Sequence, residues 1–244
     1  MFDHVTIRVS DREASERFYE NVLRVLDYEK GWSDETLAEW NTFSLMVATS
    51  TEEKPVTRRL HLGFQSPSRE RADEFWRVGT EAGYRSDGEP GPRPEYGDDY
   101  YGSFLLDPDG NSAEATHHGV MRGEGPIDHL WIRVSDVAAA KEFYEAVAVH
   151  AGFRLGHDTP ERAQFVGQAG SFSVVAGAEP TDSVHLAFPA DTNEAVDEFH
   201  RALTGAGYRD NGPPGERPIY HEGYYGAYVL DPDGNNVELV NHNR

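Results

Sequence analysis

The chain contains two copies of one sequence. Residues 2–20 and 127–145 share 11 of 19 residues, 73–88 and 197–212 share 10 of 16, and 104–114 and 228–238 share 7 of 11. Because the copies of a duplicated segment fold alike, the repeat predicts two homologous domains. We place them at residues 1–118 and 127–244, joined by a linker at residues 119–126 that contains glycine and proline.

Each copy predicts the same order of elements, a strand, a helix and further strands, twice over. Apolar residues alternate at Val5, Ile7 and Val9, and Ser10 or Asp11 follows as a helix N-cap. The turn Asp107-Pro-Asp-Gly110 joins the last two strands of the first copy. The predicted fold class is therefore α+β. The predicted strands are 4–9, 28–32, 37–40, 42–48, 59–65, 101–106, 112–116, 128–134, 163–175, 184–188, 226–230 and 236–241, and the helices start at residues 10, 68, 138 and 193.

Composition restricts the partners and the chemistry. The 244 residues include no cysteine, so a metal can be held only by histidine, carboxylate or water. The net charge of −21 disfavours binding to nucleic acid and to anionic membranes. No apolar run approaches the roughly 18 residues of a membrane span, and residues 1–7 lack the features of a signal peptide. We therefore expect a cytoplasmic protein.

Three polar residues recur at matching places in the two copies. By alternation along a strand, each of them points away from the apolar face that packs under the helices. Two imidazoles and one carboxylate form a facial triad that leaves coordination positions open, which indicates catalysis rather than a structural site. We expect one metal site in each repeat. The predicted ligands are His4, His61 and Glu114 in the first repeat, and His129, His185 and Glu238 in the second.

These motifs resemble the vicinal oxygen chelate superfamily, which includes glyoxalases, extradiol dioxygenases and bleomycin resistance proteins. The resemblance rests on Asp-His in the first strand, Phe-Tyr-Glu in the first helix, the histidine in mid-repeat, and Leu-Asp-Pro-Asp-Gly-Asn-x-x-Glu. It covers nearly the whole chain twice. The resemblance implies paired βαβββ modules that form an open, U-shaped barrel with a divalent metal in its cleft.

The second repeat also resembles the extradiol dioxygenase signature, from Ile219-Tyr-His221 to Tyr228 and Glu238. The resemblance implies that His221 and Tyr228 bind and protonate the substrate. In the first repeat, Gly97 and Phe104 stand at these two places. A surface position for His221 and a packing role for Tyr228 are the structural alternatives.

Residues that share a face with the ligands, or precede the last hairpin, are predicted to bind substrate. Arg133 has an ion pair as its alternative, and the two tyrosines have core packing. His118 and His242, each four residues after a glutamate, are candidate donors to the ligands, with a frayed strand end as the alternative, above all for His242. The predicted substrate-binding residues are Trp131, Arg133, Tyr224 and Tyr225.

The predicted function is a divalent-metal-dependent lyase or dioxygenase, which acts on a small molecule through metal chelation of two adjacent oxygens. The triad favours Fe²⁺, and Mn²⁺, Ni²⁺ and Zn²⁺ stay open. The alternative is a metal-independent drug-binding protein of the bleomycin resistance type, with Trp131 and the tyrosines as its contact surface. We expect a monomer or a homodimer.

Overall fold

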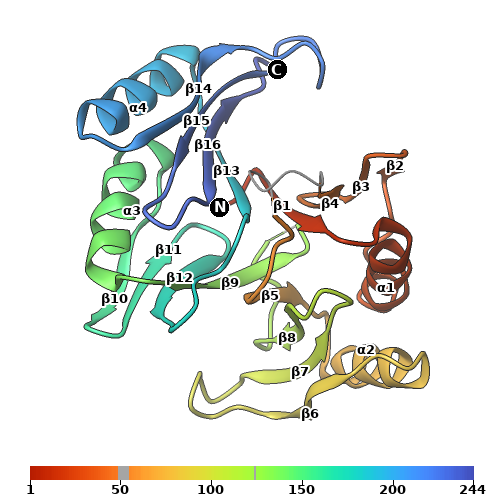
Figure 1. Cartoon of the computed structure of the whole chain (residues 1–244). Helices are drawn as coiled ribbons and strands as arrows, with labels where there is room; N and C mark the ends of the chain where they lie inside the picture. Colours follow the sequence, from red (N-terminus) through yellow and green to blue (C-terminus); the bar gives the residue numbers. More distant parts are fainter. Residues whose placement is uncertain (49–54, 124) are drawn as a thin grey trace. The chain divides into compact units, whose positions relative to one another are not determined.

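The computed structural model describes residues 1–48, 55–123 and 125–244, so Glu124 of the predicted linker lies outside the described residues. The chain consists of four consecutive βαβββ modules (Figure 1). The first two modules are β1 (His4–Val9), α1 (Arg12–Val25), β2 (Trp32–Ser33), β3 (Leu37–Trp40), β4 (Phe43–Val47), and β5 (Leu60–Gln65), α2 (Arg69–Glu81), β6 (Ser86–Pro92), β7 (Tyr101–Leu106), β8 (Ser112–His117). The last two are β9 (Ile127–Val134), α3 (Val137–Ala151), β10 (Arg154–Thr159), β11 (Arg162–Val166), β12 (Ser171–Ala176), and β13 (His185–Pro189), α4 (Asn193–Gly205), β14 (Arg209–Glu216), β15 (Tyr225–Leu230), β16 (Asn236–Asn241). The predicted α+β class is confirmed.

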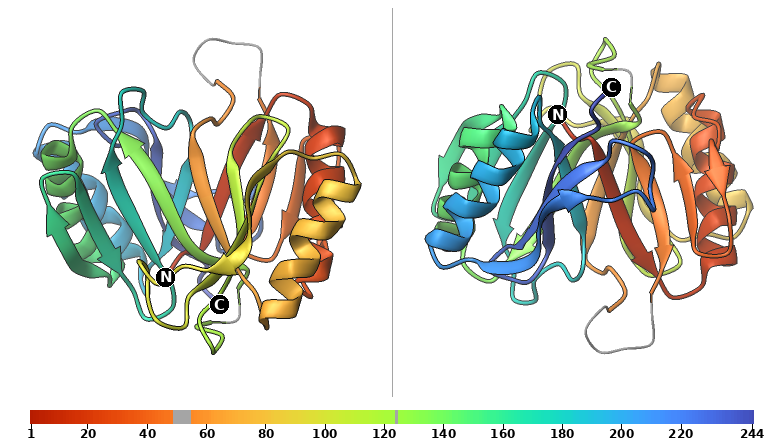
Figure 2. Two further views of the ribbon diagram at one scale, coloured as in Figure 1. Left: turned by 90° about the horizontal axis from the view of Figure 1, so that it is seen from below. Right: turned by 90° about the horizontal axis from the view of Figure 1, so that it is seen from above.

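The local signals that predicted these elements act as expected. Asp11 caps α1 by accepting a hydrogen bond from the backbone N–H of Ala14, and Ser68 caps α2 through Arg71. Gly83 follows α2 in the left-handed region, at φ 90°. The alternating apolar residues of β1 are buried, as are those of β5 and β16. Helices α1 and α2 pack against each other, as do α3 and α4 (Figure 2).

Some strands were not predicted because their sequences differ from those of typical strands. Strands β6 and β14 are rich in glycine and proline, yet each forms the edge of a sheet, where a missing N–H is tolerated. Their registers shift at Gly88 and Gly212. The single strand predicted over residues 163–175 is two strands, β11 and β12, joined by a turn in which the N–H of Gly167 donates to Gly170. Strand β10 was also missed.

The strands form two open eight-stranded sheets, in the orders β14-β15-β16-β13-β1-β4-β3-β2 and β10-β11-β12-β9-β5-β8-β7-β6. By its contacts the chain divides into two compact units. One unit comprises Thr6–Trp131, and the other comprises Met1–Val5 with Ile132–Arg244. The divisions fall inside β1 and β9. Each of these two strands therefore begins in one unit and continues in the other.

The Asp-Pro-Asp-Gly-Asn turn joins the last strand of each repeat to the first helix of that repeat and to the serine that precedes this helix. Asp107 accepts hydrogen bonds from the backbone N–H of Asp109 (2.9 Å) and Asn111 (2.8 Å), and from the hydroxyl of Tyr19 in α1 (2.9 Å). Asp109 in turn accepts from the N–H and hydroxyl of Ser10. The second copy repeats this pattern with Asp231, Asp233, Asn235, Tyr144 and Ser135. The repeated motif is thus a turn that fixes where the following strand begins.

Among the described residues, no helix is long and apolar enough to span a membrane.

Candidate metal centres

The six predicted ligands form two groups of three, but not the groups that the repeats predicted. The His61 group consists of His61, Glu114 and His129, and the His4 group consists of His4, His185 and Glu238. Within each group the ligand atoms lie within 4.8 Å of one another. The prediction that each repeat supplies a complete triad is therefore wrong. The first histidine of each repeat joins the second histidine and the glutamate of the other.

The exchange follows from the topology of the sheets. Strand β1 lies beside β13, with the N–H of Asp3 donating to the carbonyl of Ala187 at 2.9 Å. His4 stands at the start of β1, in the unit that contains β13 and β16. Likewise, His129 lies in the part of β9 that belongs to the same unit as β5 and β8. Each group therefore lies within one compact unit.

The His61 group has the dimensions of three metal ligands. The Nε2 atoms of His61 and His129 are 3.1 Å apart, and the Oε2 atom of Glu114 lies 2.9 and 3.2 Å from them. Cis ligands of an octahedral ion with bonds of about 2.1 Å are separated by about 3.0 Å. The three atoms therefore match one face of an octahedron.

The His4 group is similar but more open. The Nε2 atoms of His4 and His185 are 3.0 Å apart, and Oε2 of Glu238 lies 3.0 Å from His185. The edge from His4 to Glu238 is longer, at 3.7 Å. The His4 side chain is 26% exposed, against 8% for its counterpart His129. The donor set still fits a divalent ion, with one ligand less tightly enclosed.

One glycine accounts for the different burial of the two histidines. A Cβ atom added at Gly63 in β5 would lie 2.3 Å from Cε1 of His129, so the imidazole occupies the space that a side chain would take. The matching position in β13 is Ala187, which is fully buried. His4 therefore cannot take the place that His129 takes.

An aspartate orients the first histidine of each group. Nδ1 of His129 donates to Oδ2 of Asp128 at 2.8 Å, and Nδ1 of His4 donates to Oδ1 of Asp3 at 2.8 Å. Because an ionised carboxylate can only accept, these bonds place a proton on Nδ1. In the neutral ring, Nε2 then carries the lone pair that a metal requires. The Asp-His pair of the sequence thus has a defined role at both groups.

A buried tyrosine holds each glutamate. The hydroxyl of Tyr100 donates to Oε1 of Glu114 at 2.8 Å, and that of Tyr224 donates to Oε1 of Glu238 at 2.7 Å. Glycines make room for these carboxylates, since a Cβ atom at Gly102 or Gly226 would come within 2.4 or 2.5 Å of Oε1. Oε1 is thus occupied by a phenol, and Oε2 faces the two histidines.

The charge distribution of the His61 group favours a cation among its three ligands. Burial acts to raise the pKa of Glu114, but hydrogen bonds from His129 and His61 outweigh it and lower this pKa to about 2. Burial acts to lower the pKa of His129, and hydrogen bonds to Asp128 and Glu114 overcome it and raise this pKa to about 9. The group therefore retains a proton at neutral pH when no metal replaces it.

The other predicted residues of the second repeat lie at different distances from the His4 group. Tyr228 is the cross-strand neighbour of Glu238, and its ring centroid lies 6.2 Å from that of His185. Burial, followed by the charge of Glu238, raises the pKa of Tyr228, so its phenol stays protonated. Tyr225 instead donates to Asp197 of α4 at 2.7 Å, on the helix side of the sheet. The Tyr224 hydroxyl donates to Oε1 of Glu238, and a substrate contact of its ring stays a prediction.

Trp131 lies beside the His61 group rather than beside the other ligands of its own repeat. Its ring centroid is 6.4 Å from that of His61 and 6.0 Å from that of Tyr96, which is 51% exposed. Phe104 lies on the same group, 6.0 Å from His61. Arg133 is exposed on β9, and its backbone N–H donates to Thr181 at 2.9 Å. The substrate-binding role of Arg133 stays a prediction.

His221 is connected to the His4 group through other side chains. Its Nε2 lies 2.8 Å from Nδ1 of His242, and Nε2 of His242 lies 2.7 Å from Oδ2 of Asp3. Nδ1 of His221 contacts the carbonyl of Glu222 at 2.7 Å. The expectation that His242 donates toward the ligands is met through Asp3.

Three residues near the ligands have contacts that the sequence did not predict. Tyr96 and Tyr100 precede β7, and their residue type indicates neither the contact of Tyr96 with Trp131 nor the bond of Tyr100 to Glu114. Arg122 lies in the predicted linker, where nothing in the local sequence indicates a partner. Its guanidinium binds both carboxylate oxygens of Asp128, with Nε 2.7 Å from Oδ1.

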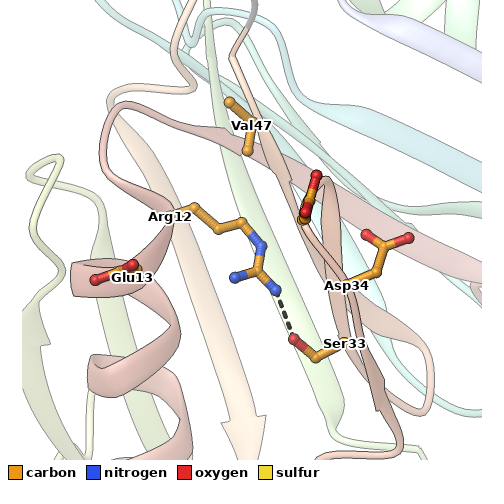
Figure 3. Close-up of a pocket in the computed structure, with 6 residues that line it drawn as sticks. Arg12, Glu13, Ser33, Asp34 and Val47 are labelled. Carbon is orange, nitrogen blue, oxygen red and sulfur yellow. Dashed lines mark hydrogen bonds between the residues drawn. The ribbon is translucent and has the colours of Figure 1, made fainter.

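A separate surface depression lies at the start of α1 and is lined by Arg12, Glu13, Ser33, Asp34, Glu35 and Val47 (Figure 3). The guanidinium of Arg12 donates to Ser33 there, and also to Glu16 at 2.9 Å. The charge of Arg12 is thus paired within α1, and none of the six predicted ligands lines this depression.

The family model "Glyoxalase/Bleomycin resistance protein/Dioxygenase superfamily" matches residues 1–115 and 126–239. The chain belongs to this superfamily, and its two-domain glyoxalase-like fold agrees with the four βαβββ modules. A search of curated proteins gives no match.

Solved structures are similar over the whole chain. Glyoxalase I from Zea mays has a TM-score of 0.68 and 18% identity, with 99% of this chain and 92% of that chain covered. A putative dioxygenase from Bacillus subtilis has a TM-score of 0.68 and 11% identity, with coverages of 100% and 85%. The Mn(II)-bound glyoxalase from Novosphingobium aromaticivorans has a TM-score of 0.43 and 16% identity, with coverages of 100% and 82%.

Proposed function

We propose that this protein is a divalent-metal-dependent enzyme of the glyoxalase or dioxygenase type, which acts on a small molecule with two adjacent oxygen atoms. The observation that supports it most is the convergence of three ligand atoms in each group, with separations of 2.9 to 3.2 Å in the His61 group and 3.0 to 3.7 Å in the His4 group. Asp3 and Asp128 direct the Nε2 lone pairs of His4 and His129 toward the other ligands. When bound, a divalent ion at such a group supplies Lewis acidity to chelated substrate oxygens. Fe²⁺ is the first choice for a facial triad, before Mn²⁺, Ni²⁺ and Zn²⁺.

The protein's own residues fix the ligands and hold one proton. Tyr224 and Tyr100 keep the carboxylates of Glu238 and Glu114 in one orientation by binding Oε1. At the His4 group we propose that the protonated phenol of Tyr228, which lies beside Glu238 and His185, donates a hydrogen bond to a substrate oxygen. At the His61 group Phe104 replaces it and offers no proton. Proton transfer by a side chain is therefore proposed for the His4 group.

The side chains around the His61 group favour a flat, apolar part in its substrate. The rings of Trp131 and Phe104 lie beside His61, and the exposed Tyr96 lies beside Trp131. Such rings bind planar or apolar groups well. The same rings favour a second candidate function, metal-independent binding of an aromatic drug. A net charge of −21 makes nucleic acids and anionic membranes unsuitable partners for either function.

Metal analysis of protein purified without added metal tests the proposal. We expect up to two transition-metal ions per chain, with one ion lost in His185→Ala or Glu238→Ala and the other lost in His61→Ala. The matched control is His200→Ala, which removes an imidazole bound to Asp210 away from both groups. A protein that binds no divalent metal, yet binds aromatic compounds in a manner that depends on Trp131, contradicts the enzyme function and supports the binding protein.

A further inference from the structure

We propose that His221 and His242 are positioning residues for the metal bound by the His4 group, acting on His4 through Asp3. The inference rests on the proposed function, because it concerns a metal held by His4, His185 and Glu238. It gives His221 a role different from substrate protonation.

The contacts form one continuous series. Asp3 accepts from His4 at Oδ1 (2.8 Å) and from His242 at Oδ2 (2.7 Å), and His242 contacts His221 at 2.8 Å. The rings of His221 and His242 are stacked, with centroids 5.0 Å apart. Both ring nitrogens of His221 are engaged, one by His242 and the other by the carbonyl of Glu222. A histidine held in this way orients its neighbours rather than exchanging a proton with a substrate.

The direction of the contacts follows from the two ends of the series. The carbonyl of Glu222 and the carboxylate of Asp3 can only accept. Nδ1 of His221 therefore donates to Glu222, and Nε2 of His242 donates to Oδ2 of Asp3. The bond from His242 holds Asp3 in place while its other oxygen accepts from Nδ1 of His4.

At the His61 group, other residues make the corresponding contacts to the aspartate beside the first histidine. Asp128 accepts from His129, from Nε2 of His118 at 3.1 Å, and from the guanidinium of Arg122. His118 stands where His242 stands in the other repeat, whereas Gly97 replaces His221. Arg122 thus donates to the carboxylate of Asp128, and the histidine pair takes that place at Asp3.

The test measures Mn²⁺ affinity by the electron paramagnetic resonance of free Mn²⁺ in two backgrounds. His61→Ala leaves only the His4 group, and His185→Ala leaves only the His61 group. In the first background we expect His242→Ala to weaken Mn²⁺ binding by about 10–100-fold, the usual effect of removing a partner of a metal ligand. His221→Ala should weaken it by a smaller factor. In the second background neither substitution should change the affinity, whereas His118→Ala should weaken it.

Two further variants separate positioning from a general loss of structure. His242→Gln, whose amide can still donate to Asp3, should restore part of the affinity lost in His242→Ala, while the unfolding temperature of the metal-free protein stays the same. His200→Ala should bind Mn²⁺ like its parent. If the His61→Ala protein binds Mn²⁺, and neither His242→Ala nor His221→Ala changes its affinity, this inference is wrong while the proposed function stands. Parents that bind none of Fe²⁺, Mn²⁺, Ni²⁺ and Zn²⁺ in the same titration contradict the proposed function as well as this inference.

Discussion

The His4 group and the His61 group contain the same three ligands but differ in everything around them. The His61 group is tighter, with edges of 2.9 to 3.2 Å. Its first histidine is enclosed over Gly63 and donates to Asp128, which also binds Arg122. The His4 group has one edge of 3.7 Å, a more exposed first histidine, and the phenol of Tyr228 nearby. Duplication therefore preserved the three predicted ligands in each group, while the residues around them diverged.

The largest expected effect concerns Gly63. Replacing it with alanine puts a methyl group 2.3 Å from Cε1 of His129, so the imidazole must move out of the His61 group. We expect Gly63→Ala to weaken metal binding there by about 100-fold or more, comparable with losing a residue that orients a ligand. Ala187→Gly, the matched change at the His4 group, should have little effect. Metal titration in the His185→Ala and His61→Ala backgrounds measures the two effects, and equal affinities would show that Gly63 does not set the difference.

A second comparison concerns the tyrosines behind the glutamates. Tyr224→Phe and Tyr100→Phe each leave Oε1 of a buried carboxylate without its phenol. An unsatisfied buried acceptor costs about 1–3 kcal/mol, so each variant should unfold at lower denaturant concentration when metal-free. Tyr225→Phe removes an exposed bond to Asp197 and should cost much less. Chemical unfolding of the three variants checks the order, and a cost for Tyr225→Phe as large as that for Tyr224→Phe would contradict it.

The free energy of unfolding of the metal-free protein should depend on pH through His129 and Glu114 of the His61 group. The pKa of His129 in the folded protein is raised to about 9, so its stabilising charge is fully present below its unfolded pKa and is lost as pH rises through about 9. The pKa of Glu114 is lowered to about 2, so its contribution is present above its unfolded pKa and is lost as pH falls toward about 2.

We expect metal-free protein to lose stability, on the order of 1 kcal/mol, between pH 7 and pH 9.5. His129→Gln should remove this loss, and a bound metal should also remove it by replacing the proton. Thermal unfolding across this range measures the effect. A metal-free profile identical to that of His129→Gln would contradict the charge assigned to the group.

The six residues of the two groups could be predicted from the sequence, but which three of them lie together could not. His4, Glu114 and their counterparts could be identified because duplication repeats them on polar faces of strands. Their grouping depends on which distant strand lies beside β1, and a repeat is equally compatible with either pairing. Arg122 was missed because its contact with Asp128 depends on the path of the linker. Strands β6 and β14 were missed because their glycines and prolines are acceptable only at a sheet edge.

Tyr224 illustrates a similar limit. Its position before the last hairpin predicted a substrate contact, and only the cross-strand geometry shows its hydroxyl on Glu238. The aromatic residue type was informative, but its partner lies on the next strand.

The exchange of histidines between the repeats is tested most directly by two double variants. His4→Ala with His185→Ala removes two ligands of one structural group, so this protein should still bind one metal ion per chain. His4→Ala with His61→Ala damages both groups and should bind none. If each repeat formed its own site, the results would be reversed, with no ion bound by the first variant and one ion bound by the second. Metal content after dialysis, measured for both variants and the parent, decides between the two arrangements.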